Sequence, residues 1–570
     1  MSRPDAATTA KPLLAALSVA TLLILSPANV VLDHNIRFLQ YEWRLLVFAW
    51  AAWGLLVVVL RPLFAWSLGG PEARGWLLRA VTALVVVLAV MQARFDLAPL
   101  VPSGPALAVP GGVACLLVAV VWRVRRSTLV TALVVLAPLV LLEAYTSYRV
   151  LRQIQGRPVA SPVLAREGAK GPNVFHLVFD EFSLLPILDP EGRLDERIVP
   201  NLAAFAREAT FFPEATSHYP DTVYSLASVF RSQLIRPDWS GDSYLAFGHA
   251  VQGRSLFRYL KERGYRVEVF GQHIPYRKLL GVLADRTSGR ESDVPLAHAS
   301  YAYLSRLFGE PLIRAVYRVS GLENATDDGF AIGAADLMAL ATRRGAMLPD
   351  RGVYYYVHVL LPHFPFVYAA DGRRVQRKDP RLADYVEQIR YTDRLFGAFV
   401  SALRAGGRYD ESLIIVHSDH GVRYPFPDLG IDLPAGVPRS TTALISAVPE
   451  SLDVLARVPL LVKAPGQRTG AVRREPVTLL DVYPTVAEVV GGVPEGVRGA
   501  SLLSPADPLP HRTWRPFLTA PADRRPGRGE QAYRVHVSGR TASGWEEMTE
   551  AEFEETFRPV DPRMAEPLLP

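Results

Sequence analysis

Cysteine is nearly absent from this sequence, whose 570 residues include only Cys115. A single thiol cannot close an intrachain disulfide, so the fold must be held by its core and by any metal that it binds. Dense clusters of Lys and Arg interleaved with aromatic residues are also missing after residue 146, although the net charge is +6. We therefore expect no nucleic-acid partner. No internal repeat is evident.

Long apolar runs are abundant before residue 146. Each approaches the ~20 residues that cross a bilayer core, and they lie at Leu13–Leu32, Leu45–Leu60, Leu77–Met91, Ala106–Trp122 and Leu129–Tyr145. The third run is the shortest and carries Arg79 near its start. We predict a membrane domain, residues 1–146, with five transmembrane helices. A cleaved signal peptide is the alternative for the first run, but its length and the runs that follow favour a retained anchor.

The basic residues that flank these runs predict their orientation. With the N-terminus inside, the short outer loops carry Arg37, Arg44 and Arg94. The cytoplasmic side carries a larger set, namely Arg3, Lys11, Arg61, Arg74, Arg79, Arg123, Arg125 and Arg126. This asymmetry follows the positive-inside rule, and five spans then place everything after residue 146 outside the cytoplasm. We expect a multi-pass protein of a prokaryotic cytoplasmic membrane with an extracytoplasmic soluble domain.

Strands and helices alternate after a juxtamembrane linker, residues 147–172. The predicted strands are Val174–Phe179, Val267–Phe270, Val353–Leu361, Leu413–Val416 and Val458–Val462. The predicted helices are Pro200–Glu208, Ser255–Arg263, Ile332–Thr342, Leu382–Arg404 and Thr478–Val490. This alternation predicts an α/β domain, residues 173–508, with a mainly parallel sheet flanked by helices. Residues 509–570, rich in Pro and charge, are predicted as a C-terminal tail that packs on the surface or stays mobile.

Two polar patterns lie early in this domain. The first predicted strand ends in Asp180 and Glu181, which are either turn formers and helix caps or part of a site. Thr222 follows a loop and begins a helical pattern. It is either an N-cap or first-turn residue, or a hydroxyl that can be ionised beside a metal and attack phosphorus or sulfur.

Two further patterns place histidines after strands. His363 stands between Pro362 and Pro365, as either an aromatic–histidine packing corner or a substrate contact. A later strand ends in Asp419-His420-Gly421. A carboxylate and an imidazole from one turn can converge on a cation, and the glycine lets the backbone bend, although a capped turn is the alternative.

The order of these patterns resembles the alkaline phosphatase superfamily in its sulfatase-like branch. The resemblance covers residues 170–505 and rests on an acid-ended strand, Thr-x-x-Ser, Leu-Pro-His-x-Pro-Phe and Ser-Asp-His-Gly in that order. Later elements of the same pattern are Gly271-Gln272-His273 and Leu480-Asp481-Val482-Tyr483-Pro484-Thr485. With the preceding membrane spans, the chain is similar to lipoteichoic acid synthases and phosphoethanolamine transferases.

This resemblance implies roles for individual residues. Thr222 would be the nucleophile and a metal ligand, and Asp419 and His420 would bind the same metal. The remaining ligand would be Asp180, with Glu181 as the second choice. The transferred anionic group would contact two histidines, His363 and His273. A single divalent metal ion is implied, either Zn²⁺, which suits Asp, His and Thr ligands, or Mn²⁺ or Mg²⁺, which suit oxygen-rich sets.

Departures from the family patterns narrow the expected chemistry. The chain has no Cys or Ser followed by x-Pro-x-Arg, which formylglycine-dependent sulfatases require. It also lacks the disulfides and the further histidine of phosphoethanolamine transferases. We therefore predict a membrane-anchored, metal-dependent enzyme that transfers or hydrolyses a phosphoryl-linked head group on a lipid or envelope-polymer substrate. The alternatives are a hydrolase of sulfuric or phosphoric monoesters with the same site, and a catalytically inactive membrane scaffold.

Overall fold

The computed structural model describes residues 6–35, 43–69, 71–97, 108–155, 168–237, 243–288, 328–375, 377, 380–424, 426, 452–505, 515–519, 534–541, 544–549 and 551–552, with single positions between 301 and 320. Residues 156–167 of the predicted linker and 553–570 of the predicted tail lie outside this part of the chain. The chain divides into two compact units, residues 1–157 with 292–326, and residues 158–291 with 327–570. Each unit is described by itself below.

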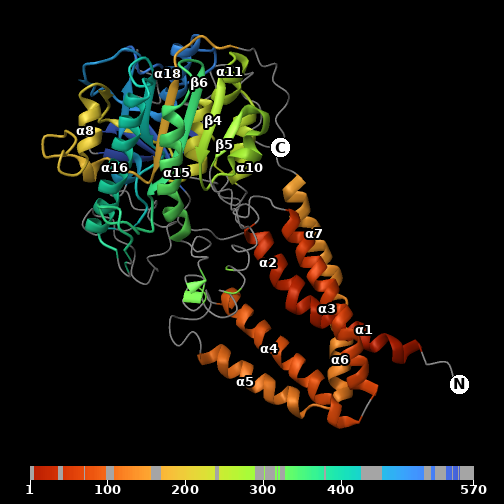
Figure 1. Cartoon of the computed structure of the whole chain (residues 1–570). Helices are drawn as coiled ribbons and strands as arrows, with labels where there is room; N and C mark the ends of the chain where they lie inside the picture. The colour runs from red at the N-terminus through yellow and green to blue at the C-terminus, as the bar shows by residue number, and fades with distance from the viewer. Residues whose placement is uncertain are drawn as a thin grey trace. The chain divides into compact units, whose positions relative to one another are not determined.

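The N-terminal unit consists of apolar helices, red to orange in Figure 1. They are α1 (Ala6–Ala20), the π-helical turn η1 (Thr21–Leu25), α2 (Ser26–Asn35), α3 (Trp43–Gly69), the 3-10 turn η2 (Glu72–Gly75), α4 (Trp76–Leu97), α5 (Ala108–Arg123), α6 (Arg126–Leu136) and α7 (Leu139–Gln155). Buried Ala, Val, Leu and Phe side chains form their common core. A buried amide also joins two helices, because Asn29 Nδ2 donates to Glu143 Oε2 at 2.8 Å and Ser147 Oγ donates to Asn29 Oδ1 at 2.9 Å.

Three stretches of the described helices are long and apolar enough to cross a membrane, namely Ala10–Asn29, Trp43–Leu68 and Arg126–Arg152. The apolar parts of α4 and α5, Trp76–Val87 and Gly112–Arg123, are shorter. Described helices therefore occur at every predicted span, and three stretches combine the length and the apolar composition that crossing a bilayer requires. Crossing by all five stays a prediction.

The second unit is built on an eight-stranded sheet with the order β5-β4-β6-β1-β7-β8-β2-β9. Its strands are β1 (Val174–Asp180), β2 (Thr210–Phe211), β4 (Arg266–Gly271), β5 (Arg286–Ser288), β6 (Val353–Pro362), β7 (Leu413–Ser418), β8 (Leu460–Lys463) and β9 (Ala471–Val472). The central strand β1 runs parallel to β6 and β7, whereas β8 is antiparallel to β7 and β2. A separate pair joins β3 (Ala215–Thr216) to β10 (Val477–Thr478). The predicted α/β class with a mainly parallel sheet is confirmed.

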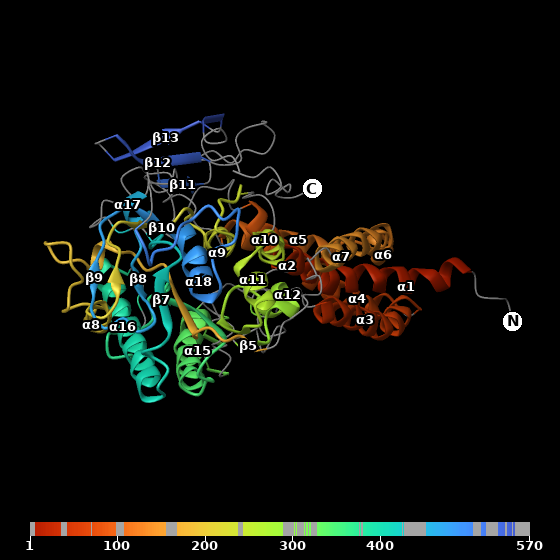
Figure 2. The ribbon, with the colours of Figure 1, turned by 90° about the horizontal axis from the view of Figure 1, so that it is seen from above.

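Helices cover both faces of this sheet (Figure 2). One face packs on α8 (Pro200–Ala206), α15 (Asp328–Ala346) and α16 (Leu382–Ala405), and the other lies under α9 (Thr222–Arg231), α10 (Ser243–Gln252), α11 (Leu256–Glu262), α12 (Tyr276–Leu280) and α18 (Val482–Val490). On the first face Phe175 packs edge-on against Phe399, with 5.9 Å between ring centroids. On the second, Phe230 packs on Tyr356 at 5.2 Å. Because side chains alternate along a strand, Asp180 lies on the face opposite Phe175 and Phe179.

Short elements complete this unit. They are the 3-10 turns η4 (Leu185–Ile187), η5 (Gly281–Leu283) and η10 (Leu479–Asp481), and the helix α17 (Leu452–Ala456). Part of the predicted tail forms an antiparallel sheet of β11 (Arg515–Thr519), β12 (Arg534–Thr541) and β13 (Gly544–Met548). Strand β11 docks beside the loop that precedes α9, because Leu518 N donates to the His218 carbonyl at 2.8 Å and His218 Nδ1 lies 2.7 Å from the Pro516 carbonyl. Phe517 and Leu518 are fully buried there.

Candidate metal centre

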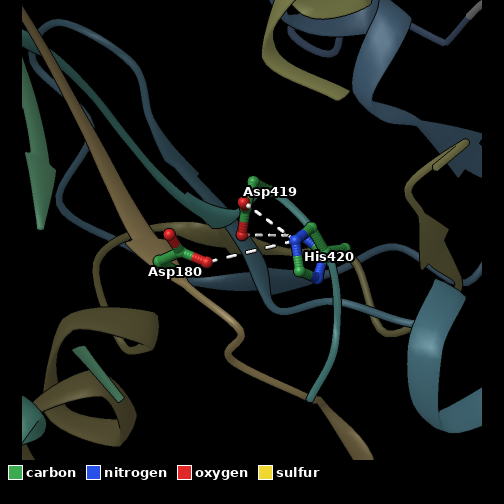
Figure 3. A group of neighbouring side chains, drawn as sticks. All are labelled: Asp180, Asp419 and His420. Atoms are coloured by element: carbon green, nitrogen blue, oxygen red, sulfur yellow. Dashed lines mark hydrogen bonds and ion pairs between the residues drawn. The ribbon is translucent and has the colours of Figure 1, made fainter. Parts of the chain in front are cut away.

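Parallel pairing brings two acid-ended strands to the same edge of the sheet. Strands β1 and β7 pair in register, from Val174 opposite Leu413 to Phe179 opposite Ser418. The next residue of each chain segment, Asp180 and Asp419, therefore lies beside the other. The register of β1 against β6 shifts between Phe179 and Asp180. Such an irregularity turns a side chain away from its regular direction. Ligand atoms of Asp180, Asp419 and His420 all lie within 4.8 Å of one another, and the three side chains converge in Figure 3.

The imidazole of His420 points its unprotonated nitrogen into this cluster. Its Nδ1 lies 2.8 Å from the Gly421 carbonyl oxygen. A carbonyl only accepts, so Nδ1 carries the proton and Nε2 presents its lone pair. That Nε2 is 3.3 Å from Asp419 Oδ2 and 4.0 Å from Asp180 Oδ1. A metal-binding histidine is commonly fixed by a carbonyl in this way.

Thr222 is the first residue of α9 and faces the same cluster. Asp221 caps the helix, its Oδ1 accepting from Val223 N at 3.0 Å and from Tyr224 N at 3.2 Å. Thr222 Oγ1 is then 3.4 Å from Asp180 Oδ2 and 3.3 Å from His420 Nε2. The hydroxyl is buried at the positive end of a helix dipole, where a negative charge on oxygen is stabilised.

The electrostatics of the cluster fit a divalent cation. Burial, and next the neighbouring charge of Asp419, raise the pKa of Asp180 to about 7. Burial would raise the pKa of Asp419 as well, but His420 and His358 outweigh it and hold that pKa below its usual value. Asp419 Oδ2 is buried and has no hydrogen-bond partner in the described part of the chain. A cation would neutralise both carboxylates and satisfy this oxygen, and the oxygen-rich set with one imidazole suits Zn²⁺, Mn²⁺ or Mg²⁺.

Glu181 faces a different partner from that of its neighbour Asp180. Its φ of 57° lies in the left-handed region, which non-glycine residues seldom adopt outside functional sites. In that conformation Arg423 Nε donates to Glu181 Oε1 at 2.6 Å, and His363 Nε2 is 3.5 Å from the same oxygen. Burial would raise the pKa of Glu181, but His363 and Arg423 more than offset it and lower that pKa. The structure groups Asp180, and not Glu181, with Asp419 and His420.

His363 and His273 occupy distinct positions beside the site. His363 is a quarter exposed, and Arg423 donates from Nη2 to its Nε2 at 3.2 Å. Because both side chains are partly exposed beside the buried cluster, we call them the rim pair. His273 Nε2 lies 2.9 Å from the Tyr244 hydroxyl. Burial, and then the charge of His363, lower the pKa of His273 to about 3, so it is neutral at physiological pH. Contact of either histidine with a substrate stays a prediction.

Sequence reasoning missed two residues at the site. Arg423 follows the Asp-His-Gly turn by two positions, and a basic side chain just beyond a two-ligand turn was the available signal. His358 lies on β6, opposite Val178, with Nε2 3.6 Å from Asp180 Oδ2. Burial lowers the pKa of His358 to about 4, which makes it a neutral imidazole. In the sequence, His358 alternates with Tyr356 and Tyr354, which indicates that the three side chains lie on the same face of the sheet. The sequence does not indicate how far His358 lies from Asp180.

The adjacent acids allow a matched test of the metal ligands. Asp180→Asn should abolish the rise in melting temperature that Mn²⁺ or Zn²⁺ gives to the full chain in detergent, because it removes a carboxylate of the cluster. Glu181→Gln should keep that rise, because Glu181 is bonded to Arg423. Ligand binding to the folded state alone contributes about 2.7 kcal/mol at a concentration of 100 Kd. Equal loss of the rise in both variants would show that both acids bind the ion.

The backbone at Gly421 has no room for a side chain. A Cβ atom there would lie 1.8 Å from the Val454 carbonyl oxygen, and Gly421 N donates to the Leu455 carbonyl at 2.7 Å. Gly421→Ala should therefore displace the Asp-His turn, lowering stability by about 1–3 kcal/mol and weakening metal binding. Urea unfolding and calorimetric titration with Mn²⁺ measure the two effects. The control is Gly345→Ala, a helical position whose Cβ would approach no atom closer than 3.4 Å; a neutral Gly421→Ala would contradict the prediction.

Comparison with known proteins finds relatives of two kinds. Arylsulfatase K of Danio rerio is 31% identical over 123 residues, which cover 21% of this chain and 20% of that protein. Lipoteichoic acid synthase of Staphylococcus saprophyticus is 25% identical over 141 residues, covering 24% and 20%. The matched part is thus about a fifth of the length of these curated relatives.

Solved structures with a similar chain course include a phosphonate monoester hydrolase from Silicibacter pomeroyi, with a TM-score of 0.45, 16% identity, and coverage of 64% of this chain and 85% of that one. The lipoteichoic acid synthase LtaP of Listeria monocytogenes gives a TM-score of 0.39 at 16% identity, with coverage of 72% and 94%. The model of the sulfatase family matches residues 172–493, more than half of the 570 residues and the whole of the site described above. The chain therefore belongs to the sulfatase family.

Proposed function

We propose that this chain is a membrane-anchored, metal-dependent enzyme that cleaves a phosphodiester on a lipid head group or a lipid-linked envelope polymer, with Thr222 as nucleophile. The observation that carries the proposal is the position of the Thr222 hydroxyl. It lies 3.4 Å from Asp180 and 3.3 Å from His420, at the start of α9 and inside the cluster of potential ligands. Asp180, Asp419, His420 and Thr222 would hold one divalent ion.

The metal, when bound, would lower the pKa of the coordinated hydroxyl and neutralise charge on the phosphoryl group. The residues of the chain provide the rest of the chemistry. The positive end of α9 stabilises the Thr222 alkoxide. Arg423 and His363 lie beside the cluster, and the guanidinium N–H groups of Arg423 that are not bonded to Glu181 or His363 can donate to the non-bridging oxygens of a phosphodiester. Glu181 holds Arg423 in this place through the 2.6 Å hydrogen bond.

The reaction proposed is a double displacement. Thr222 Oγ bonds to phosphorus while the ester bond to the lipid oxygen breaks. The proton that Thr222 loses passes to solvent, and the lipid oxygen takes one proton from solvent to leave as the diacylglycerol alcohol. The head group then remains as a phosphodiester of Thr222. Water, or a hydroxyl of a second head group, next bonds to phosphorus and gives up its proton, and Thr222 leaves as a hydroxyl. Water makes the enzyme a hydrolase, whereas an acceptor hydroxyl makes it a transferase.

Membrane attachment supports a lipid substrate. The described helices include stretches that can cross a bilayer, and the basic residues around them predict an extracytoplasmic active site. A domain tethered in this way meets a lipid head group by diffusion in two dimensions. Some relatives of the chain are named lipoteichoic acid synthase. Both observations favour an envelope substrate over a soluble one.

A sulfuric or phosphoric monoester substrate is the second candidate, because another relative is named an arylsulfatase. The segment from Thr222 reads Thr-Val-Tyr-Ser-Leu and contains neither the Cys or Ser nor the Pro and Arg from which a formylglycine site is made. A threonine alkoxide can attack phosphorus in a diester or in a monoester, so the nucleophile alone does not choose between these substrates. Product analysis with a phospholipid that carries a labelled head group therefore decides between the candidates.

Replacement of the nucleophile gives the direct test. Thr222→Ala should lower kcat on a labelled phosphodiester lipid by at least ~10³-fold, while Thr222→Ser should keep measurable turnover because it retains the hydroxyl. Thr485→Ala is the control, since Thr485 is a buried threonine whose hydroxyl donates elsewhere, to the Asp481 carbonyl at 2.6 Å. Full activity of Thr222→Ala would overturn the assignment. Transfer would leave diacylglycerol and a modified acceptor, and hydrolysis would leave a free head-group phosphate.

The rim pair predicts a separate effect on substrate binding. Arg423→Gln removes the positive charge beside the anionic substrate, so KM should rise by about 10-fold or more, in line with the loss of a charge-assisted hydrogen bond of about 1.5–3 kcal/mol. The Kd for Mn²⁺ should change little, because Arg423 is bonded to Glu181 and His363 and not to the metal cluster. Initial rates across substrate concentrations and a metal titration measure both quantities. An unchanged KM would remove Arg423 from the substrate site.

A further inference from the structure

One imidazole nitrogen near the cluster is buried without a hydrogen-bond partner in the described part of the chain. It is Nε2 of His358, a fully buried side chain on β6. Its nearest acidic atom is Asp180 Oδ2, at 3.6 Å, a few tenths of an ångström beyond a hydrogen bond. An unsatisfied buried polar atom costs about 1–3 kcal/mol. A small approach of the Asp180 carboxylate would satisfy this nitrogen.

The hydrogen bond at the other ring nitrogen of His358, Nδ1, determines which nitrogen carries the proton. His358 Nδ1 lies 3.0 Å from the Tyr276 hydroxyl, and that hydroxyl lies 3.2 Å from the hydroxyl of Tyr356. Among the described residues, Tyr276 is the only hydrogen-bond partner recorded for the buried Tyr356 hydroxyl. Tyr356 must therefore donate to Tyr276, because otherwise its own proton would be unsatisfied. Tyr276 then donates to His358 Nδ1, and the neutral imidazole keeps its proton on Nε2.

We propose that Tyr356, Tyr276 and His358 form a chain of donors that ends on Asp180, in which His358 is a positioning residue for the metal-binding carboxylate. The inference rests on the proposed metal centre. His358 Nε2–H would hold Asp180 Oδ2, while Asp180 Oδ1, on the side of His420 at 4.0 Å, would remain for the cation. The register shift of β1 at Asp180 brings the carboxylate to this position beside β6.

The alternative is that His358 binds the metal directly. The proton assigned to His358 Nε2 argues against this alternative. A nitrogen that carries a proton has no lone pair for a metal. His358 also lies outside the group of mutually close ligand atoms, which contains Asp180, Asp419 and His420. Outer partners of this kind keep a ligand oriented, and their loss commonly costs 10–100-fold in metal affinity.

Substitutions at three positions test the chain of donors in the full-length protein in detergent, with Mn²⁺ as the probe in a calorimetric titration. His358→Ala should raise the Kd for Mn²⁺ by about 10–100-fold. His358→Gln, whose amide offers an N–H in place of Nε2–H, should restore most of that affinity. Tyr276→Phe should weaken binding because it frees the ring to take the other tautomer. Tyr356→Phe should weaken it less, because Tyr276 keeps its hydroxyl beside Nδ1 but loses the donor that orients it.

His176→Gln is the matched control. His176 is another fully buried histidine on the same face of the sheet, with its nitrogens 2.7 Å from the Tyr354 hydroxyl and 2.6 Å from His417 Nε2. Its replacement should lower the melting temperature without changing the Kd for Mn²⁺. A change in Kd that follows melting temperature across all these variants would reduce His358 to a stabilising residue and overturn the proposal.

A spectroscopic count separates positioning from ligation. Electron spin-echo modulation of the Mn²⁺-loaded protein should show one directly bound imidazole nitrogen, from His420, and the same count in His358→Gln. Two bound nitrogens in the native chain, with one lost in His358→Gln, would make His358 a ligand and refute the chain of donors. If the native chain bound neither Mn²⁺ nor Zn²⁺, the proposed metal centre itself would fail. If it bound Mn²⁺ and His358→Ala bound it equally well, the inference about His358 alone would fail.

Discussion

Two carboxylates, those of Asp180 and Asp419, are enclosed together at one edge of the sheet, and the surrounding site depends on balancing their charges. In a buried environment two like charges repel strongly, and burial alone already favours the neutral forms. The cationic side chain of Arg423 is bonded to Glu181 and not to either of these carboxylates. A divalent ion bound between them would neutralise both carboxylates. The free lone pair of His420 and the hydroxyl of Thr222 then have the same cation to bind.

The adjacent residues Asp180 and Glu181 direct their carboxylates to different partners. Asp180 ends the strand and enters the cluster, whereas the φ of 57° at Glu181 turns the next carboxylate to the rim. The Tyr385 hydroxyl donates to the Glu181 carbonyl at 2.5 Å and Ser183 N donates to that hydroxyl at 2.9 Å, so the unusual conformation is held by the core. The proposed metal ligand Asp180 and the carboxylate that holds Arg423 are therefore carried by adjacent residues of one segment that is hydrogen-bonded to the core.

The strands and the acid-ended pattern could be predicted from sequence because buried parallel strands are continuous apolar runs and their ends meet at one edge. The four residues Asp180, Thr222, Asp419 and His420 accordingly lie together in the structure. The choice between Asp180 and Glu181 depended on one backbone angle, which composition does not encode. His358 depended on the register of β6 against β1, and β11 was hidden by the Pro-rich, charged residues around it.

The docking of β11 has a consequence for the order in which the protein matures. The loop that leads into Thr222 obtains two of its hydrogen-bond partners, at Pro516 and Leu518, from a strand encoded almost three hundred positions later. During synthesis, the loop before Thr222 would therefore lack both of these partners until β11 has been added, although Ser217 N can already bond to the Ala456 carbonyl. The environment of the proposed nucleophile would be completed only when β11 docks.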